Sequence, residues 1–523
     1  MKPYFSQHQK PENTFCSHKL LLLFLIIPLS LTGCHLPENL PTALPDSPQR
    51  QTEIARILNP TELTPQTQDP TPTLSVQELP AVEPPAIFGD EVITYTTQQG
   101  DTLPALAARF NVPTDAIQSN APFSSTGLLP VGVLVEMPNK LESVLSHHAA
   151  ILPDCEVTYG PCVGDFDTID FIQEAGGFLA GYSELVKGQT LTGPEIVHWV
   201  ALETSTNPRL LLAFLEYRSG WVLGSPDGAV SEDYPIGYGA RDTGLYNELM
   251  ITAKLLAQGF YGWREGSFTQ LTFYGGKTGR LSPTLNAGSV ALMHLFANLY
   301  KEEHWTSQLI EPGEFLLFYQ RMFGDYHERA FQVEPYLLAT TTAPELALPF
   351  PIGEIWSLTG GPHITWQTGT PFGALDFAPV TGEPPCAISA LWATAAAPGL
   401  VVRSERGVVA LDLDGDGDEG TGWVLIYLHM AEEDRASLNT WLEQDQLIGH
   451  PSCEGGNASG THLHFTRKFN GEWVGVEEPL PLILSGWHVV AGERRYEGLL
   501  IKEGQVVTSH PNGSSSSTII RDE

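Results

Sequence analysis

The stretch Gly460-Thr461-His462-Leu463-His464-Phe465 decides the fold of the C-terminal part of the chain. Its two histidines lie two residues apart in an apolar, β-prone run, so they project from the same face of a strand. Two imidazoles on one face suit a metal-dependent hydrolase, in which one nitrogen holds the ion and another handles a proton. The same pair also fits a half-exposed strand face, so the motif needs support from elsewhere in the chain.

Two other stretches of the C-terminal region give that support. Gly360-Gly361-Pro362-His363 runs on to Ala374-Leu375-Asp376-Phe377, and a third stretch ends in Tyr427-Leu428-His429. Beyond residue 349 the apolar residues occur in short runs divided by Gly, Pro and Asp, which predicts a sheet with 408–411 and 423–428 as a hairpin. Four histidines and one carboxylate therefore become candidates for a single site.

With these stretches in order, residues 350–490 resemble the M23 family of zinc metallopeptidases, and within it the β-lytic endopeptidase branch. In most M23 members the first histidine lies four residues before the aspartate. In this chain the residue four positions before Asp376 is Phe372. The longer loop of the β-lytic branch accounts for that departure. The resemblance implies one Zn²⁺ held by His363, Asp376 and His464, with water in the fourth position.

The same resemblance implies that His429 and His462 move the proton and stabilise the oxyanion in an endopeptidase that cleaves the peptide part of peptidoglycan. The alternative to an active endopeptidase is a metal-free, inactive fold that only binds the wall or a partner enzyme. Between the hairpin strands, Asp412, Asp414 and Asp416 have the spacing of a calcium loop. Trp423 stands where such a loop needs glutamate, so either a weak calcium site or a solvated acidic turn is expected.

The N-terminus reads as a targeting segment. Lysines precede the apolar run Leu20–Ile27, and Leu31-Thr32-Gly33-Cys34 follows. This ending resembles the lipobox of bacterial lipoproteins, which implies cleavage before Cys34, lipidation of its thiol and a membrane partner through the lipid. An uncleaved signal anchor is the alternative, and both interpretations put the chain outside the cytoplasm, facing the cell wall. The formal net charge of -34 excludes nucleic acid as a partner.

After cleavage of the signal segment and lipidation of Cys34, four cysteines remain in an oxidising compartment. We expect Cys155 to pair with Cys162 as a tight local loop, and Cys386 with Cys453 as a staple in the C-terminal domain. A four-cysteine metal site is the competing interpretation, but no Cys-x-x-Cys spacing supports it.

At 523 residues the chain requires several domains. After a signal peptide at 1–33, residues 34–91 are rich in Pro, Thr, Gln and Glu and predict a disordered tether. Gln99-Gly100-Asp101-Thr102-Leu103, with Leu134–Pro138 after it, is similar to a LysM domain over 92–140, which implies a βααβ fold that binds N-acetylglucosamine-containing glycan such as peptidoglycan.

Residues 150–345 predict helices. Thr192-Gly193-Pro194-Glu195 is a capping box that begins one helix, and Asn207-Pro208 begins the next, which stops near Ser219. Further apolar helices are expected at 289–300 and 313–323. This segment faintly resembles the catalytic-glutamate helices of lysozyme-like enzymes, so a glycosidase using Glu216 is an alternative function.

The predicted fold class is therefore multidomain: a βααβ LysM module, a mainly α-helical middle domain and a mainly antiparallel β peptidase domain at 346–495. A last strand near Leu499–Ile501 and a Ser-rich tail, expected to be disordered, complete 496–523.

Overall fold

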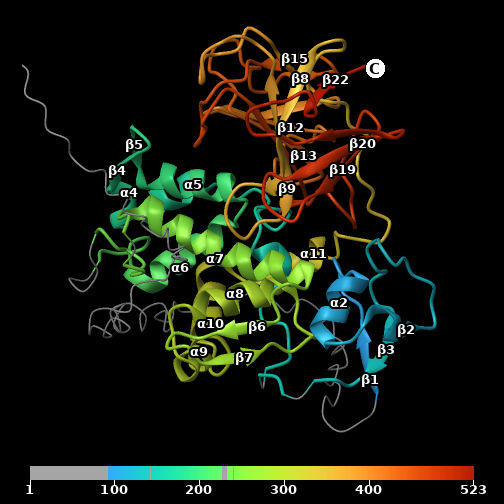
Figure 1. The fold of residues 1–523 in the computed structure, drawn as a ribbon. Helices are drawn as coiled ribbons and strands as arrows, with labels where there is room; N and C mark the ends of the chain where they lie inside the picture. Colours follow the sequence, from blue (N-terminus) through green and yellow to red (C-terminus); the bar gives the residue numbers. More distant parts are fainter. Residues whose placement is uncertain (1–91, 142, 146, 227–231, 240, 523) are drawn as a thin grey trace, which may run out of the picture. The chain divides into compact units, whose positions relative to one another are not determined.

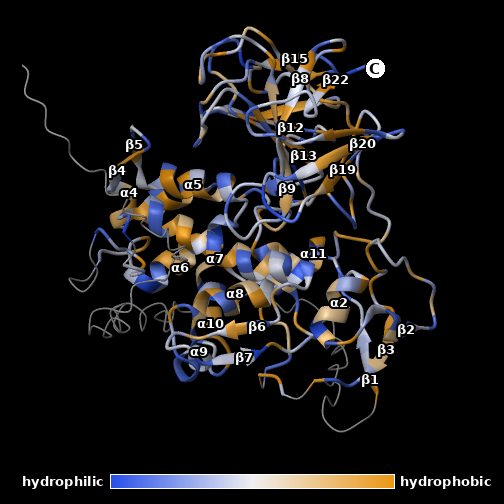
Figure 2. Ribbon diagram, viewed as in Figure 1, coloured by the Kyte–Doolittle hydropathy of each residue, from blue (hydrophilic) through white to orange (hydrophobic). Residues whose placement is uncertain are grey.

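The computed structural model describes residues 92–522, except 142, 146, 227–231 and 240. The predicted signal peptide, the lipidation site at Cys34 and the tether over 34–91 lie outside these residues. Within the described part of the chain, no helix is both long and apolar enough to span a membrane. Figure 1 traces the elements in the colours of the sequence, and Figure 2 shows apolar residues along the helices and strands that follow.

Residues 92–140 form a small three-stranded sheet with one helix packed on it. The Thr102 side chain begins that helix by accepting a hydrogen bond from the N–H of Ala105, and Asn111 ends it in a left-handed conformation. Where a second helix is predicted there is only a 3-10 turn, because the backbone is extended again at Ile117. The assignment of residues 92–140 to the LysM family stays a prediction. The elements are β1 Val92–Thr96, α2 Leu103–Phe110, η1 Thr114–Ala116, β2 Gln118–Ser119 and β3 Leu134–Pro138.

The middle region is helical, as predicted, with two short hairpins added. Both reciprocal hydrogen bonds of the Thr192–Glu195 capping box are present. Asn207 caps the next helix, which ends at Gly220 in a left-handed conformation. The elements are η2 Asp154–Glu156, α3 Thr168–Ala175, α4 Phe178–Gly181, β4 Ser183–Val186, β5 Gln189–Thr192, α5 Gly193–Thr204, α6 Pro208–Ser219, α7 Leu245–Glu265, β6 Gln270–Thr272, β7 Thr278–Arg280, α8 Ala287–Ala297, α9 Glu302–Leu309, α10 Glu314–Phe323 and α11 Tyr326–Val333.

The C-terminal region contains a nine-stranded antiparallel sheet, and the predicted hairpin is its β12–β13 pair. The strand order is β14-β11-β12-β13-β16-β9-β8-β22, with β17 paired to β16. The sheet strands are β8 Ile355–Ile364, β9 Phe372–Pro379, β11 Gly399–Glu405, β12 Val408–Asp412, β13 Trp423–Leu428, β14 Trp441–Leu442, β16 Leu463–Phe469, β17 Glu472–Trp473 and β22 Thr518–Ile520.

Both faces of this sheet are buried. Val408 and Ala410 of β12 belong to one apolar core together with the middle helices, whereas Val409 and Leu411 belong to a second core within the C-terminal region. This alternation follows from the two-residue period of a strand. Short strands outside the sheet are β10 Ala393–Thr394, β15 Leu447–Gly449, β18 Ile483–Leu484, β19 Trp487–Ala491, β20 Gly498–Lys502 and β21 Gln505–Thr508.

The expectation of a disordered Ser-rich tail is wrong. The Ser517 hydroxyl hydrogen-bonds that of Ser357 at 2.7 Å, and strand β22 pairs with β8 beside it. Ile519 is buried in the C-terminal core. The burial of Ile519 and the pairing of β22 with β8 stabilise this segment as a strand, although the serines before it have a low β-propensity.

The structure joins Cys155 to Cys162 and Cys386 to Cys453, with Cα separations of 5.4 and 5.1 Å. No four-cysteine metal site therefore forms among the described residues. The second disulfide links two loops, and Thr461 reinforces the link by donating a hydrogen bond from its hydroxyl to the carbonyl of Ala387 at 2.6 Å.

Candidate metal centre

Three adjacent strands bring His363, Asp376 and His464 together. His464 on β16 lies opposite Asp376 on β9, and β9 pairs with β8, which carries His363. Opposite residues of paired strands share a face of the sheet. The His363 Nε2 and His464 Nδ1 atoms are 3.1 Å apart, and Asp376 Oδ1 lies 3.4 Å from the first and 3.2 Å from the second.

These three atoms fit the coordination of one zinc ion. Ligand atoms about 2.1 Å from a tetrahedral Zn²⁺ are separated by roughly 3.4 Å, close to the observed distances. Two imidazole nitrogens and one carboxylate oxygen are also a donor set that zinc accepts, and three protein ligands leave a fourth position open. The residues present therefore fit the metal that the sequence resemblance implies.

Backbone carbonyls select the nitrogen that each of these histidines offers. The Nδ1 atom of His363 donates to the carbonyl of Gly361 at 2.9 Å, which leaves Nε2 unprotonated toward the site. The Nε2 atom of His464 donates to the carbonyl of Thr365 at 2.9 Å, which leaves Nδ1 toward the site. Since a carbonyl only accepts, each contact fixes a tautomer and orients the ring.

His429 and His462 lie beside the three donors as a second pair. Their ring centroids are 4.5 Å apart, and Nε2 of His462 is 3.7 Å from Asp376 Oδ1. The Nδ1 atom of His429 donates to the carbonyl of Glu454 at 2.8 Å, and that of His462 to the carbonyl of Gly460 at 2.7 Å. Both Nε2 atoms are therefore free to accept a proton or a hydrogen bond.

Burial sets the charge of the site. It lowers the pKa of His363 to about 4 and that of His429 to about 3, so both rings are neutral near pH 7. For Asp376 burial acts to raise the pKa, but the close contact of His464 Nδ1 at 3.2 Å and the neighbouring imidazoles outweigh it and bring the pKa to about 2. The site thus combines one anionic carboxylate, Asp376, with at least one neutral imidazole donor, His363, and metal binding requires deprotonated ligands of this kind.

Two residues to which the sequence analysis assigned no role shape the site. The ring of Tyr496 stacks on His363 with centroids 4.2 Å apart, and Tyr496 has a φ of +69°. A Cβ atom on Gly360 would lie 2.4 Å from Oδ2 of Asp376, so only glycine leaves room for that carboxylate. The glycine pair before His363 could have signalled this close approach, whereas nothing in the sequence marks Tyr496.

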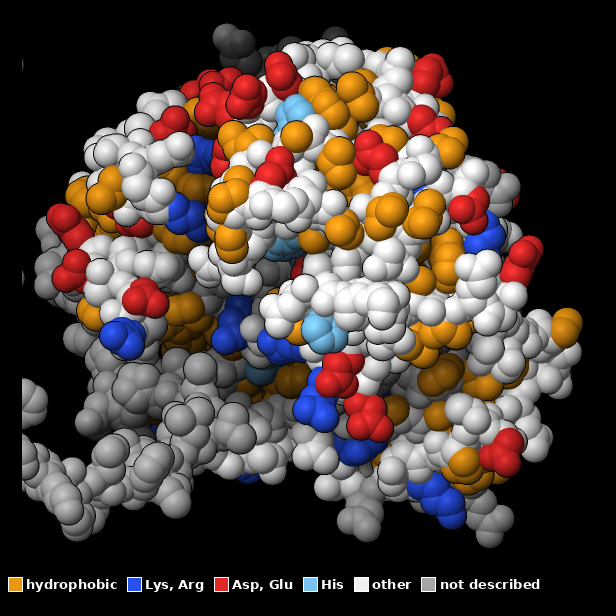
Figure 3. All heavy atoms as spheres, turned by 45° about the horizontal axis from the view of Figure 1, so that its top comes forward, with side chains coloured by type: hydrophobic (Ala, Val, Ile, Leu, Met, Phe, Trp, Pro, Cys, Tyr) orange, Lys and Arg blue, Asp and Glu red, His pale blue; other side chains and the backbone are white. Residues whose placement is uncertain are grey.

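A cleft of about 840 Å³ opens over Asp376 and His462, with segment 457–461 and Tyr496 among its walls. On the face drawn in Figure 3, acidic side chains are numerous, which fits the net charge of -34. The cleft is large enough to admit an extended peptide segment.

The Asp-rich turn brings one carboxylate oxygen each of Asp412, Asp414 and Asp416 within 4.8 Å of one another, but this clustering alone does not support a calcium site. Asp412 accepts hydrogen bonds from the backbone N–H groups of Asp414 and Gly417, and Asp414 accepts one from Asp416. These contacts account for the acidic residues as a self-bonded turn.

Glu216, the alternative catalytic residue, is 7% exposed. Its Oε2 atom accepts hydrogen bonds from the N–H groups of Val222 and Leu223 at 2.7 and 3.0 Å. The carboxylate thus ties the end of α6 to the segment that follows it.

Comparisons with known proteins give one family match and two sequence relatives. Residues 150–335 match the family model "LasA, N-terminal domain". Protease LasA from two Pseudomonas aeruginosa strains is 26% identical over 296 residues, which span 54% of this chain and 66%, just under two thirds, of the relatives' length. This sequence similarity supports a peptidase.

Solved structures give weaker overall likenesses. The M23 metalloprotease pseudoalterin from the deep sea is 24% identical, covers 32% of this chain and 96% of its own, and has a TM-score of 0.27. The catalytic domain of the antimicrobial peptidase lysostaphin from Staphylococcus simulans is 19% identical, covers 23% and 87%, and has a TM-score of 0.17.

Proposed function

We propose that this protein is a zinc-dependent endopeptidase that hydrolyses peptide bonds of peptidoglycan. The observation that carries the proposal is the convergence of His363, Asp376 and His464 at separations of 3.1–3.4 Å, with two further histidines beside them. An inactive wall-binding scaffold would have no need for all five groups, nor for carbonyls that select the tautomer of four imidazoles.

In this proposal His363, Asp376 and His464 hold the ion, which supplies a Lewis acid and lowers the pKa of water. His462 lines the cleft beside Asp376, and His429 lies next to His462, with ring centroids 4.5 Å apart; the Nδ1 atom of each ring bonds a carbonyl, so Nε2 is the nitrogen left for the reaction. One of them takes a proton from the attacking water and later gives it to the departing amine, and the other, carrying a proton taken up from solvent, donates a hydrogen bond to the oxyanion. The carbonyls of Glu454 and Gly460 hold both rings in place during that transfer.

The N-terminal segments complete the proposal. The module at 92–140 binds the glycan of the wall as a LysM domain, and lipid on Cys34 holds the chain at the membrane outside the cytoplasm. A binder on the same chain raises the local concentration of substrate at the cleft.

Digestion of purified cell walls by the full chain tests the proposal. Wild type should release new amino termini, lose this activity with a chelator and regain it with Zn²⁺. His464→Ala should lose both zinc and activity, whereas His462→Ala should keep zinc and lose about 10²- to 10⁴-fold in rate.

His488→Ala, at an exposed position on β19, is the matched control and should behave as wild type. Release of reducing ends that survives His464→Ala would instead point to a glycosidase, and digestion unaffected by the chelator would refute the proposal.

A further inference from the structure

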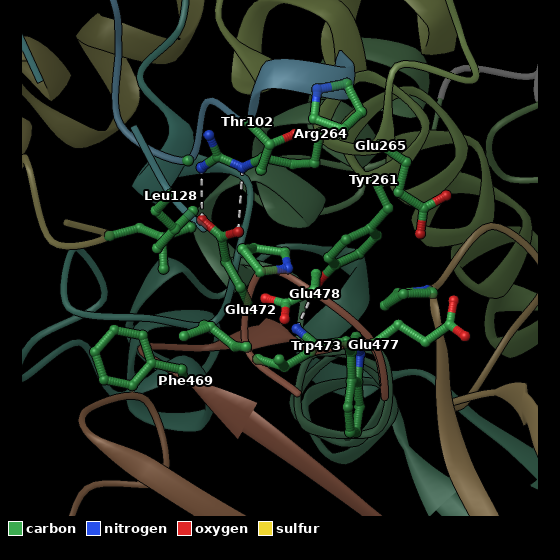
Figure 4. Close-up of a pocket in the computed structure, with 18 of the residues that line it drawn as sticks. Thr102, Leu128, Tyr261, Arg264, Glu265, Phe469, Glu472, Trp473, Glu477 and Glu478 are labelled. Atoms are coloured by element: carbon green, nitrogen blue, oxygen red, sulfur yellow. Dashed lines mark hydrogen bonds and ion pairs between the residues drawn. The ribbon is translucent and has the colours of Figure 1, made fainter. Parts of the chain in front are cut away.

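Helix α7 contacts the C-terminal region through residues spaced three apart. The hydroxyl of Tyr261 accepts a hydrogen bond from the N–H of Trp473 at 3.0 Å, and Arg264 forms an ion pair with Glu472 at 2.7 Å. Figure 4 shows both contacts at the wall of a cavity of about 350 Å³. Arg264 also bonds Gln99 and Asp154, so this end of the helix is firmly held.

One turn earlier, Gln258 of α7 lies against the loop 365–371, which joins β8 to β9. Gly369 in this loop has a φ of +107°. A Cβ atom there would be 2.6 Å from Cγ and 2.8 Å from the backbone nitrogen of Gln258. The loop backbone therefore lies directly on the helix, without room for a side chain between them.

The loop is a single closed unit. The N–H of Thr365 donates to the carbonyl of Pro371 at 3.1 Å, and the hydroxyl of Thr370 donates to the carbonyl of Gln367 at 2.8 Å. Trp366 stacks on Trp473 with centroids 6.1 Å apart and planes 11° apart. Since α7 bonds Trp473 as well, the helix holds the loop at two points.

The first carbonyl of this loop, that of Thr365, is the partner of His464 Nε2. We propose that helix α7 positions the metal ligand His464 through loop 365–371, so that the middle region is part of the metal site's support. Gly369 and Trp366 are then positioning residues. The inference rests on the proposed function, because it assumes that His464 holds zinc.

The test compares the zinc affinity of Gly369→Ala with that of wild type, measured by competition with a chelator. Loss of an oriented hydrogen-bond partner of a ligating histidine costs about 10- to 100-fold in metal affinity, and Gly369→Ala should weaken zinc binding by that factor. Gly353→Ala is the matched control: its φ is +80°, but no atom lies within 4 Å of the added methyl group.

A spectroscopic readout on the zinc-loaded proteins complements the affinity measurement. NMR should show His464 bound through Nδ1, with an Nε2–H that exchanges slowly with water and exchanges faster in Gly369→Ala. If Gly369→Ala does not fold, Trp366→Leu, which removes the ring stack, should show the same weakening.

Zinc affinities of Gly369→Ala and Gly353→Ala that agree within about twofold would overturn the inference while leaving the peptidase proposal intact. A wild type without zinc binding would instead refute the proposed function.

Discussion

A buried group of three charges gives the sharpest prediction for stability. Glu419 accepts two hydrogen bonds from Arg403, at 2.7 and 2.8 Å, and one from Lys468 at 2.7 Å. All three residues are less than 10% exposed. Burial acts to raise the pKa of Glu419, but the two cations outweigh it and lower the pKa from 4.5 to about 2. That difference corresponds to about 3 kcal/mol of stability at neutral pH.

The pH dependence has a definite sign. A carboxylate with a lowered pKa stabilises the fold above its unfolded pKa, and this contribution disappears as the pH falls from about 4.5 toward 2. Glu419→Gln should therefore be less stable than wild type by about 3 kcal/mol near pH 7, since two buried cations lose their partner. The gap between the two proteins should narrow as the pH falls below 4.5.

Urea unfolding of the full chain followed by tryptophan fluorescence at several pH values measures this gap. Glu433→Gln, at an exposed position of the same region, is the control. A gap that stays constant between pH 6 and pH 3, or a Glu419→Gln variant as stable as the control, would refute the reasoning.

Three further predictions concern features outside the metal centre. Replacing Cys386 and Cys453 together by Ser should lower stability by about 2–5 kcal/mol, seen as a lower melting temperature, with no change if the link is dispensable. Glu216→Gln should cost about 1 kcal/mol in urea unfolding and leave wall digestion unchanged; a loss of released reducing ends would contradict the structural role. Calcium at about 1 mM should leave the melting temperature unchanged, because Asp412 and Asp414 already bond the amides of their own turn, and a rise would show binding.

The sequence predicted the residues of the candidate site and a strand for His464, but it did not predict strands β8 and β9, which carry His363 and Asp376. Side-chain alternation is a local property, so the spacing of His462 and His464 predicts one strand face; in the structure β16 begins at Leu463, and His462 instead forms an isolated bridge with Ser452. The carbonyls of Gly361, Thr365, Glu454 and Gly460 that fix the tautomers could not be predicted, because every residue has a carbonyl and only the folded backbone selects one.

Helix α7 was not predicted, although it spans 21 residues. Gly259 and Gly262 lie in its last turns, and glycine ordinarily argues against a helix interior. In the structure a Cβ atom on Gly259 would lie 2.8 Å from the Cα of Ala291 on α8, so glycine permits the two helices to approach closely. Tertiary packing, which the local pattern does not contain, thus overrides propensity.

Strands β14 and β22 flank the nine-stranded sheet, and they span only two and three residues. Such short borders offer few unpaired N–H and C=O groups to an extended chain arriving from outside. The sheet therefore resists being lengthened by a foreign strand. The cleft over Asp376 and His462 leaves a different approach open, in which a peptide lies across the strands instead of extending them.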